Sequence, residues 1–241
     1  MENSQALFQG KAKIFYPTDQ EDLVLMYFTD QMSYRNGLKI EEIANKGILN
    51  NQISSLLFQY LEKQAIENHF VKMANKRACF VKKLNMLPLE VIVRNTAAGS
   101  FSKNFNIPEG LDFDQPVFEY TLKSDPLHDP LINRSQILAL NLASAKDLDL
   151  MEEIALKTNQ ALIDLFQRCK IKLIDFKIEF GHSPDGKLLL GDEISPDNCR
   201  LWDRESLEKL DKDRFRQKLG GLEEAYKEVL QRLQNVFQKG F

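Results

Sequence analysis

Residues 171–193 read IKLIDFKIEFGHSPDGKLLLGDE, and this stretch decides the fold. From Ile174 to Phe180, apolar and charged residues alternate. This is the period of a β-strand that turns one face to the core and the other to an ionic surface. The segment SPDG that follows is a turn signal, and it leads into the short apolar run KLLLG. The pattern predicts a β-hairpin.

The ionic face of the first strand would carry Asp175, Lys177 and Glu179. If the two strands pair in an odd-sum register across the turn, Asp192 joins the face of Lys177 and Glu179. A slip of one residue would reverse its side. A solvated strand face with cross-strand ion pairs explains such alternation by itself, but the chain that follows favours a site.

That following segment, GDEISPDNCRLWD at 191–203, concentrates charge in a short turn with few apolar residues before Trp202. Its charged residues are Asp192, Glu193, Asp197, Arg200 and Asp203. Close carboxylates repel unless a cation joins them, and Mg²⁺ prefers one or two protein carboxylates together with phosphate oxygens. We therefore predict Glu179 and Asp192 as magnesium ligands. The three histidines are scattered, so neither a zinc cluster nor a histidine-based nucleophile triad is expected.

Two further segments carry cations that suit an anionic ligand. QGKAKIFY places a glycine before Lys11 and Lys13, and a strand over 11–15 would project both ammonium groups to one side. A short basic edge strand is an equally good explanation. VIVRNTAAGS delivers Arg94 from an apolar strand into a small-residue loop that ends at Ser100, which an ordinary strand exit explains as well.

The rest of the chain predicts an α+β fold with mixed sheets packed by helices. Strand-like runs fill the first 85 residues around one clear helix, and Pro88 would separate a lobe over 1–87 from a lobe over 88–241. The proline-rich stretch 95–135 is predicted to form loops that line a site. Amphipathic periodicity predicts helices over 46–64, 149–168 and 222–237.

Composition and charge narrow the class of protein. The 241 residues are 43% apolar and 28% charged, which fits a globular chain. A net charge of −3 gives no global basic field for nucleic acid or a membrane surface. Without a signal-peptide core or a run of about 18 apolar residues, the expected location is the cytoplasm. Cys79, Cys169 and Cys199 are widely spaced, so reduced thiols are expected.

Taken together, these segments resemble the SAICAR synthetase family, the phosphoribosylaminoimidazole-succinocarboxamide synthases. The resemblance covers essentially the whole chain and is most specific in RNTAAGS (94–100), DFKIEFG (175–181) and DEISPDNCRLWD (192–203). It implies a two-lobed α+β fold related to ATP-grasp and kinase-like nucleotide sites, with ATP between the lobes. The implied reaction joins L-aspartate to the carboxylate of carboxyaminoimidazole ribonucleotide (CAIR) and forms SAICAR, ADP and phosphate through an acyl phosphate.

The resemblance also implies roles for individual residues. The phosphates of ATP would contact Gly10, Lys11, Ala12 and Lys13, and the adenine hinge would consist of Lys82, Leu84 and Met86. Magnesium would bind Glu179 and Asp192. The anionic groups of CAIR would contact Arg94, Ser100 and Arg200, and the rest of CAIR would contact Asp129, Asp175, Lys177, Asp197 and Arg216. The catalytic set would be Lys177 near the developing charge, with Asp175 or Asp197 able to take the amine proton.

One segment departs from the family pattern, and two alternatives stay open. In DQMSYRNG (30–37), Tyr34 and Arg35 stand where the family usually has small residues, so family contacts are not carried over there. The family implies a homodimer, and the absence of a carboxylase segment after residue 241 leads us to expect a monofunctional enzyme. A small-molecule kinase on a related fold would form ADP without aspartate. A non-catalytic regulator would bind ATP without turnover.

Overall fold

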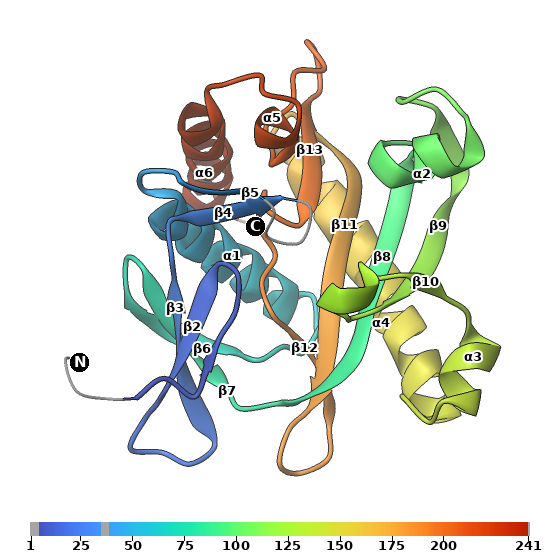
Figure 1. Cartoon of the computed structure of the whole chain (residues 1–241). Helices are drawn as coiled ribbons and strands as arrows, with labels where there is room; N and C mark the ends of the chain where they lie inside the picture. The colour runs from blue at the N-terminus through green and yellow to red at the C-terminus, as the bar shows by residue number, and fades with distance from the viewer. Residues whose placement is uncertain (1–4, 35–38, 241) are drawn as a thin grey trace.

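Two antiparallel β-sheets, joined through residues 83–84, form the framework of the molecule (Figure 1). The computed structural model describes residues 5–34 and 39–240. The first sheet has the order β1-β2-β3-β7-β6, with β1 Phe8–Gln9, β2 Lys13–Pro17, β3 Leu23–Phe28, β7 Ala78–Lys82 and β6 Phe70–Asn75. The chain also forms a two-stranded pair of β4 Gln31–Tyr34 and β5 Lys39–Glu42.

The second sheet is organised around the long strand β11, Ile171–His182. Its order is β10-β9-β8-β11-β12, and β13 also pairs with β11. The other strands are β8 Asn85–Thr96, β9 Asp112–Leu122, β10 Leu131–Ile132, β12 Leu188–Gly191 and β13 Cys199–Asp203. β8 pairs along one edge of β11, while β12 and β13 share the opposite edge.

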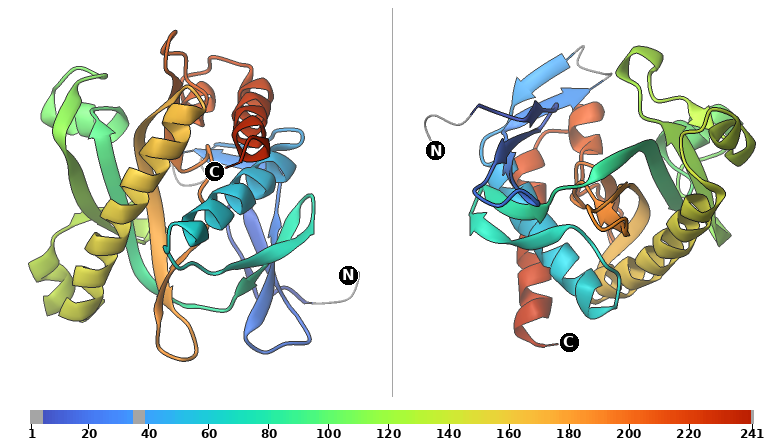
Figure 2. Two further views of the ribbon diagram at one scale, coloured as in Figure 1. Left: turned by 180° about the vertical axis from the view of Figure 1, so that it is seen from behind. Right: turned by 90° about the horizontal axis from the view of Figure 1, so that it is seen from below.

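Three long helices lie behind the sheets in the view of Figure 1, and Figure 2 shows them from that side. They are α1 Lys46–Lys63, α4 Ala145–Arg168 and α6 Leu222–Gln238. α1 contacts β3, β6, β7 and α6, whereas α4 contacts β8, β11 and β12. The shorter helices are α2 Gly99–Phe105, the 3₁₀ turn η1 Asp125–Leu127, α3 Arg134–Ala139 and α5 Asp213–Arg216.

The helices form where the sequence places apolar stripes at helical spacing, so the three predicted long helices are confirmed. In α1, Ile53, Leu57 and Leu61 are fully buried. α4 begins four residues before the predicted start because Ser144 and Asp147 form a capping box at its first turn. One hydrophobic core runs through both layers, from strands of the first sheet to strands and helices of the second.

Two predictions about the middle of the chain are wrong. Residues 112–122 were expected in a loop but form β9, which pairs with β8. Pro116 is compatible with this strand because β10 covers only its last part, so most of β9 is an edge strand. Pro88 lies inside β8 rather than between elements, and the chain changes sheets earlier, at 83–84. The division into two lobes stays a prediction.

The predicted hairpin is confirmed, but its predicted odd-sum register is wrong. Glu179 lies opposite Gly191, so an extended β12 would turn Asp192 away from the face of Glu179. β12 instead ends at Gly191, and Asp192 adopts a φ of 56° that redirects its side chain. In the turn itself, the amide of Gly186 donates to Ser183 O at 2.8 Å, and Gly186 has a φ of 82°.

Two local features of the predicted strands also differ. Lys11 does not lie on a strand, because β2 begins at Lys13 and the amide of Gly10 closes a tight turn onto Lys13 O. On β11, the register shifts between Leu173 and Asp175. Ile174 therefore leaves the main core and packs with Ala98 and Trp202 in a separate small cluster.

Candidate active site

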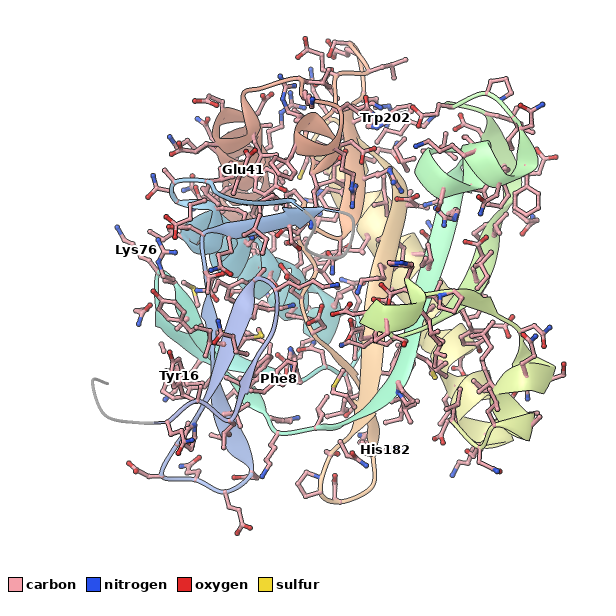
Figure 3. All side chains as sticks on the ribbon, viewed as in Figure 1. Phe8, Tyr16, Glu41, Lys76, His182 and Trp202 are labelled. Atoms are coloured by element: carbon pink, nitrogen blue, oxygen red, sulfur yellow. The ribbon has the colours of Figure 1, made fainter. Side chains whose placement is uncertain are left out.

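A cavity of about 510 Å³ is lined by residues of both sheets and of the loops that follow β12. Phe8, on β1, lines it from the edge of the first sheet that faces the second (Figure 3). The cavity is lined by many of the predicted residues: Gly10, Lys11, Ala12, Lys13, Lys82, Leu84, Met86, Asp129, Lys177, Glu179, Asp192 and Asp197. The fold thus brings together side chains separated by up to 187 residues in the sequence, from Gly10 to Asp197.

The link between the two sheets forms an aliphatic end of the cavity. Leu84 and Met86 line it together with Val24 and Val81. Gly181 on β11 permits this arrangement, because a Cβ there would lie 2.9 Å from both Leu84 Cβ and Met86 Sδ. A flat apolar group could therefore enter between the sheets at this end.

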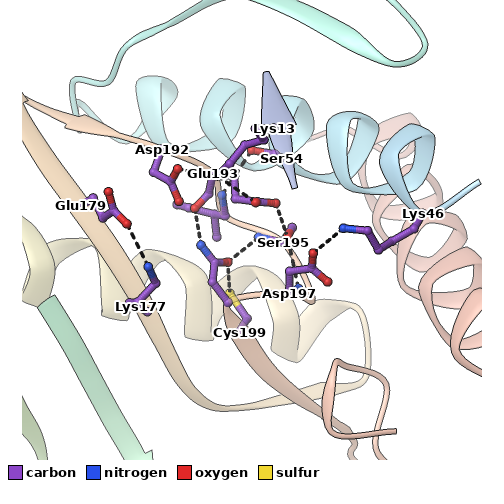
Figure 4. Close-up of polar contacts among 12 residues, drawn as sticks. Lys13, Lys46, Ser54, Lys177, Glu179, Asp192, Glu193, Ser195, Asp197 and Cys199 are labelled. Atoms are coloured by element: carbon purple, nitrogen blue, oxygen red, sulfur yellow. Dashed lines mark hydrogen bonds and ion pairs between the residues drawn. The ribbon is translucent and has the colours of Figure 1, made fainter. Parts of the chain in front are cut away.

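Lysines and carboxylates are paired at the centre of the cavity. The Lys177 ammonium donates to Glu90 Oε1 at 2.6 Å and to Glu179 Oε1 at 2.9 Å, and Lys123 forms an ion pair with Glu179 Oε2. Burial alone would lower the pKa of Lys177, but the charges of Glu179, Glu90 and Asp192 raise it well above the usual value. Lys177 is therefore a permanent cation, and Figure 4 shows its contact with Glu179.

A second pairing joins the first sheet to the end of β12. Lys13 forms an ion pair with Asp192 and lies 2.9 Å from Glu193 Oε1. Burial works against the charge of Lys13, but the two carboxylates hold its pKa above the ordinary range. Burial would also raise the pKa of Asp192, yet the charges of Lys13, Lys177 and Lys123 hold it well below the usual value. Asp192 is ionised at all physiological pH values.

Asp197 is held from two helices at once. Lys46, the first residue of α1, donates to Asp197 Oδ2 at 2.7 Å, and Tyr226 of α6 donates to Asp197 Oδ1 at 2.7 Å. Lys46 is 1% exposed and Tyr226 is fully buried. Despite burial, the charges of Lys46 and Lys212 and these two hydrogen bonds keep the pKa of Asp197 well below the usual value. Both carboxylate oxygens are occupied.

Beside the cavity lies an arginine cluster, which gathers the other predicted residues. Asp175 Oδ2 accepts from Arg94 Nη1 at 2.9 Å and from Arg200 Nη1 at 2.7 Å. Arg94 also contacts Ser100 Oγ at 3.3 Å. Asp213 accepts from both Arg200 and Arg216. The predicted residues therefore form two clusters, which meet on β11, where Asp175 belongs to the arginine cluster and Lys177 and Glu179 to the cavity.

Several residues of these clusters were not predicted. They are Lys46, Glu90, Lys123, Glu193, Lys212, Asp213 and Tyr226. Glu90 could have been suspected, because it is the only charge within the apolar run PLEVIV. Lys123 lies in the proline-rich stretch 95–135, which was predicted only to form loops that line a site. Tyr226 carries no such signal, because it occupies an ordinary apolar position of α6.

All three cysteines are buried and unpaired, which fits the expectation of reduced thiols. Burial raises the pKa of Cys79 and Cys169 to about 12 and that of Cys199 well above the usual value. None of the three is a reactive thiolate at neutral pH.

The described residues form neither a membrane-spanning helix nor a cluster of metal-binding side chains. Within residues 5–34 and 39–240, no helix has the length and apolar character needed to cross a membrane. Nor do three or more His, Cys, Asp or Glu side chains in the described part of the chain gather into a metal site.

Proteins of known family share both the sequence and the fold. The phosphoribosylaminoimidazole-succinocarboxamide synthase of Caldanaerobacter subterraneus subsp. tengcongensis is 50% identical over 98% of this chain and 100% of its own length. The crystal structure of the same synthase from Ehrlichia chaffeensis has a TM-score of 0.93 at 42% identity, covering 95% of this chain and 98% of that one. A SAICAR synthetase solved in complex with ADP has a TM-score of 0.91 at 43% identity, covering 95% and 97%.

The two sheets, the cavity between them and these relatives define an α+β enzyme of the ATP-dependent synthetase class. The model of the SAICAR synthetase family matches residues 6–233. The chain belongs to the SAICAR synthetase family. The family resemblance read from the sequence is therefore confirmed over nearly the whole chain.

Proposed function

We propose that the chain uses ATP to join L-aspartate to the carboxylate of CAIR, which yields SAICAR, ADP and phosphate. Membership of the SAICAR synthetase family supports this step of purine biosynthesis, and a relative solved with ADP supports ATP as co-substrate. The main support for the proposal is that one strand, β11, carries residues of both the arginine cluster and the cavity. Asp175 holds the buried Arg94 and the partly buried Arg200, which suit an anionic substrate, and Lys177 and Glu179 next to it line a cavity suited to phosphates.

In this proposal, ATP enters between the sheets. Leu84 and Met86, with Lys82, form the hinge beside adenine, at the aliphatic end of the cavity. The turn from Gly10 to Lys13 holds the phosphates through Gly10 and Ala12 main-chain groups and the side chains of Lys11 and Lys13. Lys11 pairs with Asp125, and Lys13 with Asp192, so phosphate oxygens would replace carboxylates that already accept from these cations.

The donor set fits Mg²⁺. Glu179 and Asp192 line one cavity, and the charges of Lys177 and Lys123 act on both carboxylates, so the same part of the cavity would offer both to a cation that also binds phosphate oxygens. We propose these two residues as its protein ligands. When bound, Mg²⁺ neutralises phosphate charge and favours phosphoryl transfer.

CAIR would lie between the cavity and the arginine cluster. Its anionic groups would contact Arg94, Ser100 and Arg200, and the other lining residues would be Asp129, Asp175, Lys177, Asp197 and Arg216. Arg94 is 3% exposed and its guanidinium is held on both sides, by Asp175 and by Glu119 at 2.7 Å. Such a fixed guanidinium can bind a planar anion with little loss of side-chain freedom.

The chemistry explains why ATP is needed. A carboxylate resists attack by an amine because oxide would have to leave, whereas an acyl phosphate releases phosphate. We propose that CAIR is first phosphorylated and that the amine of aspartate then displaces the phosphate. Lys177, a permanent cation between Glu90 and Glu179, would stabilise the negative charge that develops at the reacting oxygens. Asp175 and Asp197 would keep the neighbouring cations in place.

The test is phosphate release from MgATP with CAIR, with and without L-aspartate, followed by mass spectrometry of the product. Succinocarboxamide that forms only when all three substrates are present would establish the ligase. Stoichiometric ADP formed from CAIR without aspartate and without an amide product would favour a kinase. Folded protein that binds ATP but produces neither ADP nor amide would overturn the proposal.

Replacing Gly99 by alanine should weaken CAIR binding more than ATP binding. Gly99 has a φ of 58°, and a Cβ there would overlap the guanidinium of Arg200, 2.6 Å from Cζ. The arginine must move, so we expect KM for CAIR to rise about tenfold, or ~1.4 kcal/mol, with KM for ATP unchanged. Steady-state kinetics with each substrate varied would measure this. Equal KM values for CAIR in both proteins would contradict it.

The same family membership supports three further proposals, that the chain has two lobes, acts as a homodimer and works in the cytoplasm. Light scattering across a range of protein concentrations would test the dimer, since a dimer has twice the chain mass of 27.9 kDa.

A further inference from the structure

Lys212 is unusual among the lysines that line the cavity. Lys11, Lys13, Lys123 and Lys177 all form ion pairs with carboxylates. Lys82 and Lys83 are exposed. Lys212 is partly buried, yet no described residue, within 5–34 or 39–240, offers its ammonium group an ion pair or a hydrogen bond.

The main chain fixes Lys212 at the wall of the cavity. Its amide donates to Pro196 O at 3.0 Å, so it is tied to the loop that carries Asp197. Its carbonyl accepts from the amides of Phe215 and Arg216, which makes it the first residue before α5. Lys212 is thereby placed beside Arg216, one of the residues proposed to contact CAIR.

The charges around Lys212 nearly balance. Asp197 and Glu193 favour its protonated form, whereas Arg216 and Lys46 oppose it. Burial has the largest effect and lowers the pKa of Lys212 to about 8. A large part of the Lys212 population would therefore be neutral amine at slightly alkaline pH.

The carboxylates near it are poor proton acceptors. Asp197 receives hydrogen bonds on both oxygens, from Lys46 and Tyr226. Asp175 Oδ2 is shared by two arginines. Glu179 is paired on both oxygens with lysines. Lys212 in its neutral form offers a free lone pair to an amine that must lose its proton in this cavity. His69 also lines the cavity with an unpartnered Nε2, but burial lowers the pKa of His69 to about 4, so it is a weaker base than Lys212.

We propose that Lys212 is the proton acceptor for the amine of the amino-acid substrate. This inference rests on the proposed function and assigns to Lys212 the step that the sequence analysis gave to Asp175 or Asp197. In balance, the acyl phosphate R–CO–OPO₃²⁻ reacts with H₃N⁺–R′ to give R–CO–NH–R′, HPO₄²⁻ and H⁺. The C–N bond forms, the C–O bond breaks with its electrons on phosphate, and the nitrogen loses two protons. Lys212 takes one and phosphate keeps the other.

The experiment compares wild type with Lys212→Arg and Lys212→Ala across pH. The wild-type kcat for amide formation should rise with pH and level off above a midpoint near 8, because only neutral Lys212 accepts a proton. In both variants kcat should fall about 10²–10⁴-fold, which is the usual contribution of a general base. Their kcat should also no longer increase with pH. The control is Lys218→Ala, which changes an exposed lysine six residues away and should leave kcat unchanged.

Chemical rescue separates proton transfer from charge. Methylamine should restore a pH-dependent part of the kcat of Lys212→Ala, whereas guanidinium, which carries charge but donates no lone pair, should not. Equal rescue by guanidinium would overturn the proposal, as would a Lys212→Arg enzyme with wild-type kcat or with only a raised KM for aspartate. In those cases Lys212 anchors a carboxylate.

A measurement on the wild-type protein keeps the proposal falsifiable if a variant fails to fold. Trace acetylation at several pH values, followed by peptide mass spectrometry, should give Lys212 a midpoint near 8. A midpoint above 10 for Lys212 would overturn the inference. Failure of the proposed function can be told apart from failure of the Lys212 inference, because in the first case the wild-type protein would form no succinocarboxamide at any pH.

Discussion

Replacing Lys177 by methionine should lower kcat about 10²–10³-fold while leaving the protein folded. This decrease in kcat is the size expected when one positively charged donor to the reacting oxygens is removed. Methionine has a similar length and fills the same partly buried position on β11. The two partners of Lys177 keep other contacts, because Glu179 still pairs with Lys123 and Thr121 still donates to Glu90 at 2.7 Å.

Steady-state kinetics and thermal unfolding would be measured together. The matched control is Lys172→Met on the same strand, where the lysine forms a partly exposed ion pair with Asp112 outside the cavity. That change should leave kcat within twofold, as expected for a surface pair. If Lys177→Met kept more than a tenth of the wild-type kcat, Lys177 would not be the group that stabilises the reacting charge.

Replacing Asp175 by alanine should destabilise the protein by about 3–5 kcal/mol. Asp175 is the shared partner of Arg94 and Arg200, and all three side chains are largely buried. Removing the anion leaves two guanidinium groups without their common acceptor in a site with little access to water. Asp175→Asn should cost less, because the amide oxygen can still accept a hydrogen bond.

Urea unfolding followed by circular dichroism would measure this loss. Asp149→Ala is the control, since Asp149 pairs with Arg134 on the surface with side-chain exposures of 69% and 42%. We expect at most about 1 kcal/mol there. A loss below 1 kcal/mol for Asp175→Ala would show that Glu119 and Asp213 satisfy the two arginines without it.

Local periodicity explains why so much of the fold was predictable. The hairpin of β11 and β12 and the three long helices depend on patterns that repeat within one element, so the residues that form each element also reveal it. β9 was missed because Phe113, Val117 and Tyr120 do not share a strict alternation, and Pro116 argues for a loop. Its identity as a strand is set by pairing with β8, which no local pattern records.

The site shows the same division between local and distant information. DFKIEFG places Asp175, Lys177 and Glu179 on one face, and the structure keeps them there. Asp192 was correctly expected near Lys177 and Glu179, but for the wrong reason. The predicted register is wrong, and the positive φ of Asp192 redirects its side chain instead. The proton-transfer candidate Lys212 could not be found from sequence, since its environment depends on burial and on charges from two distant segments, around Lys46 and around Glu193 and Asp197.

The hydrogen bond from Tyr226 to Asp197 affects when the site can form as the chain is synthesised. Chains grow from the N-terminus, and α6 leaves the ribosome after both sheets. Until α6 docks, the Asp197 carboxylate keeps its hydrogen bond from Lys46 and lacks the one from Tyr226. A nascent or prematurely terminated chain without α6 would therefore hold this carboxylate by one hydrogen bond instead of two, so we expect Asp197 to be fully positioned only after the last helix has been made.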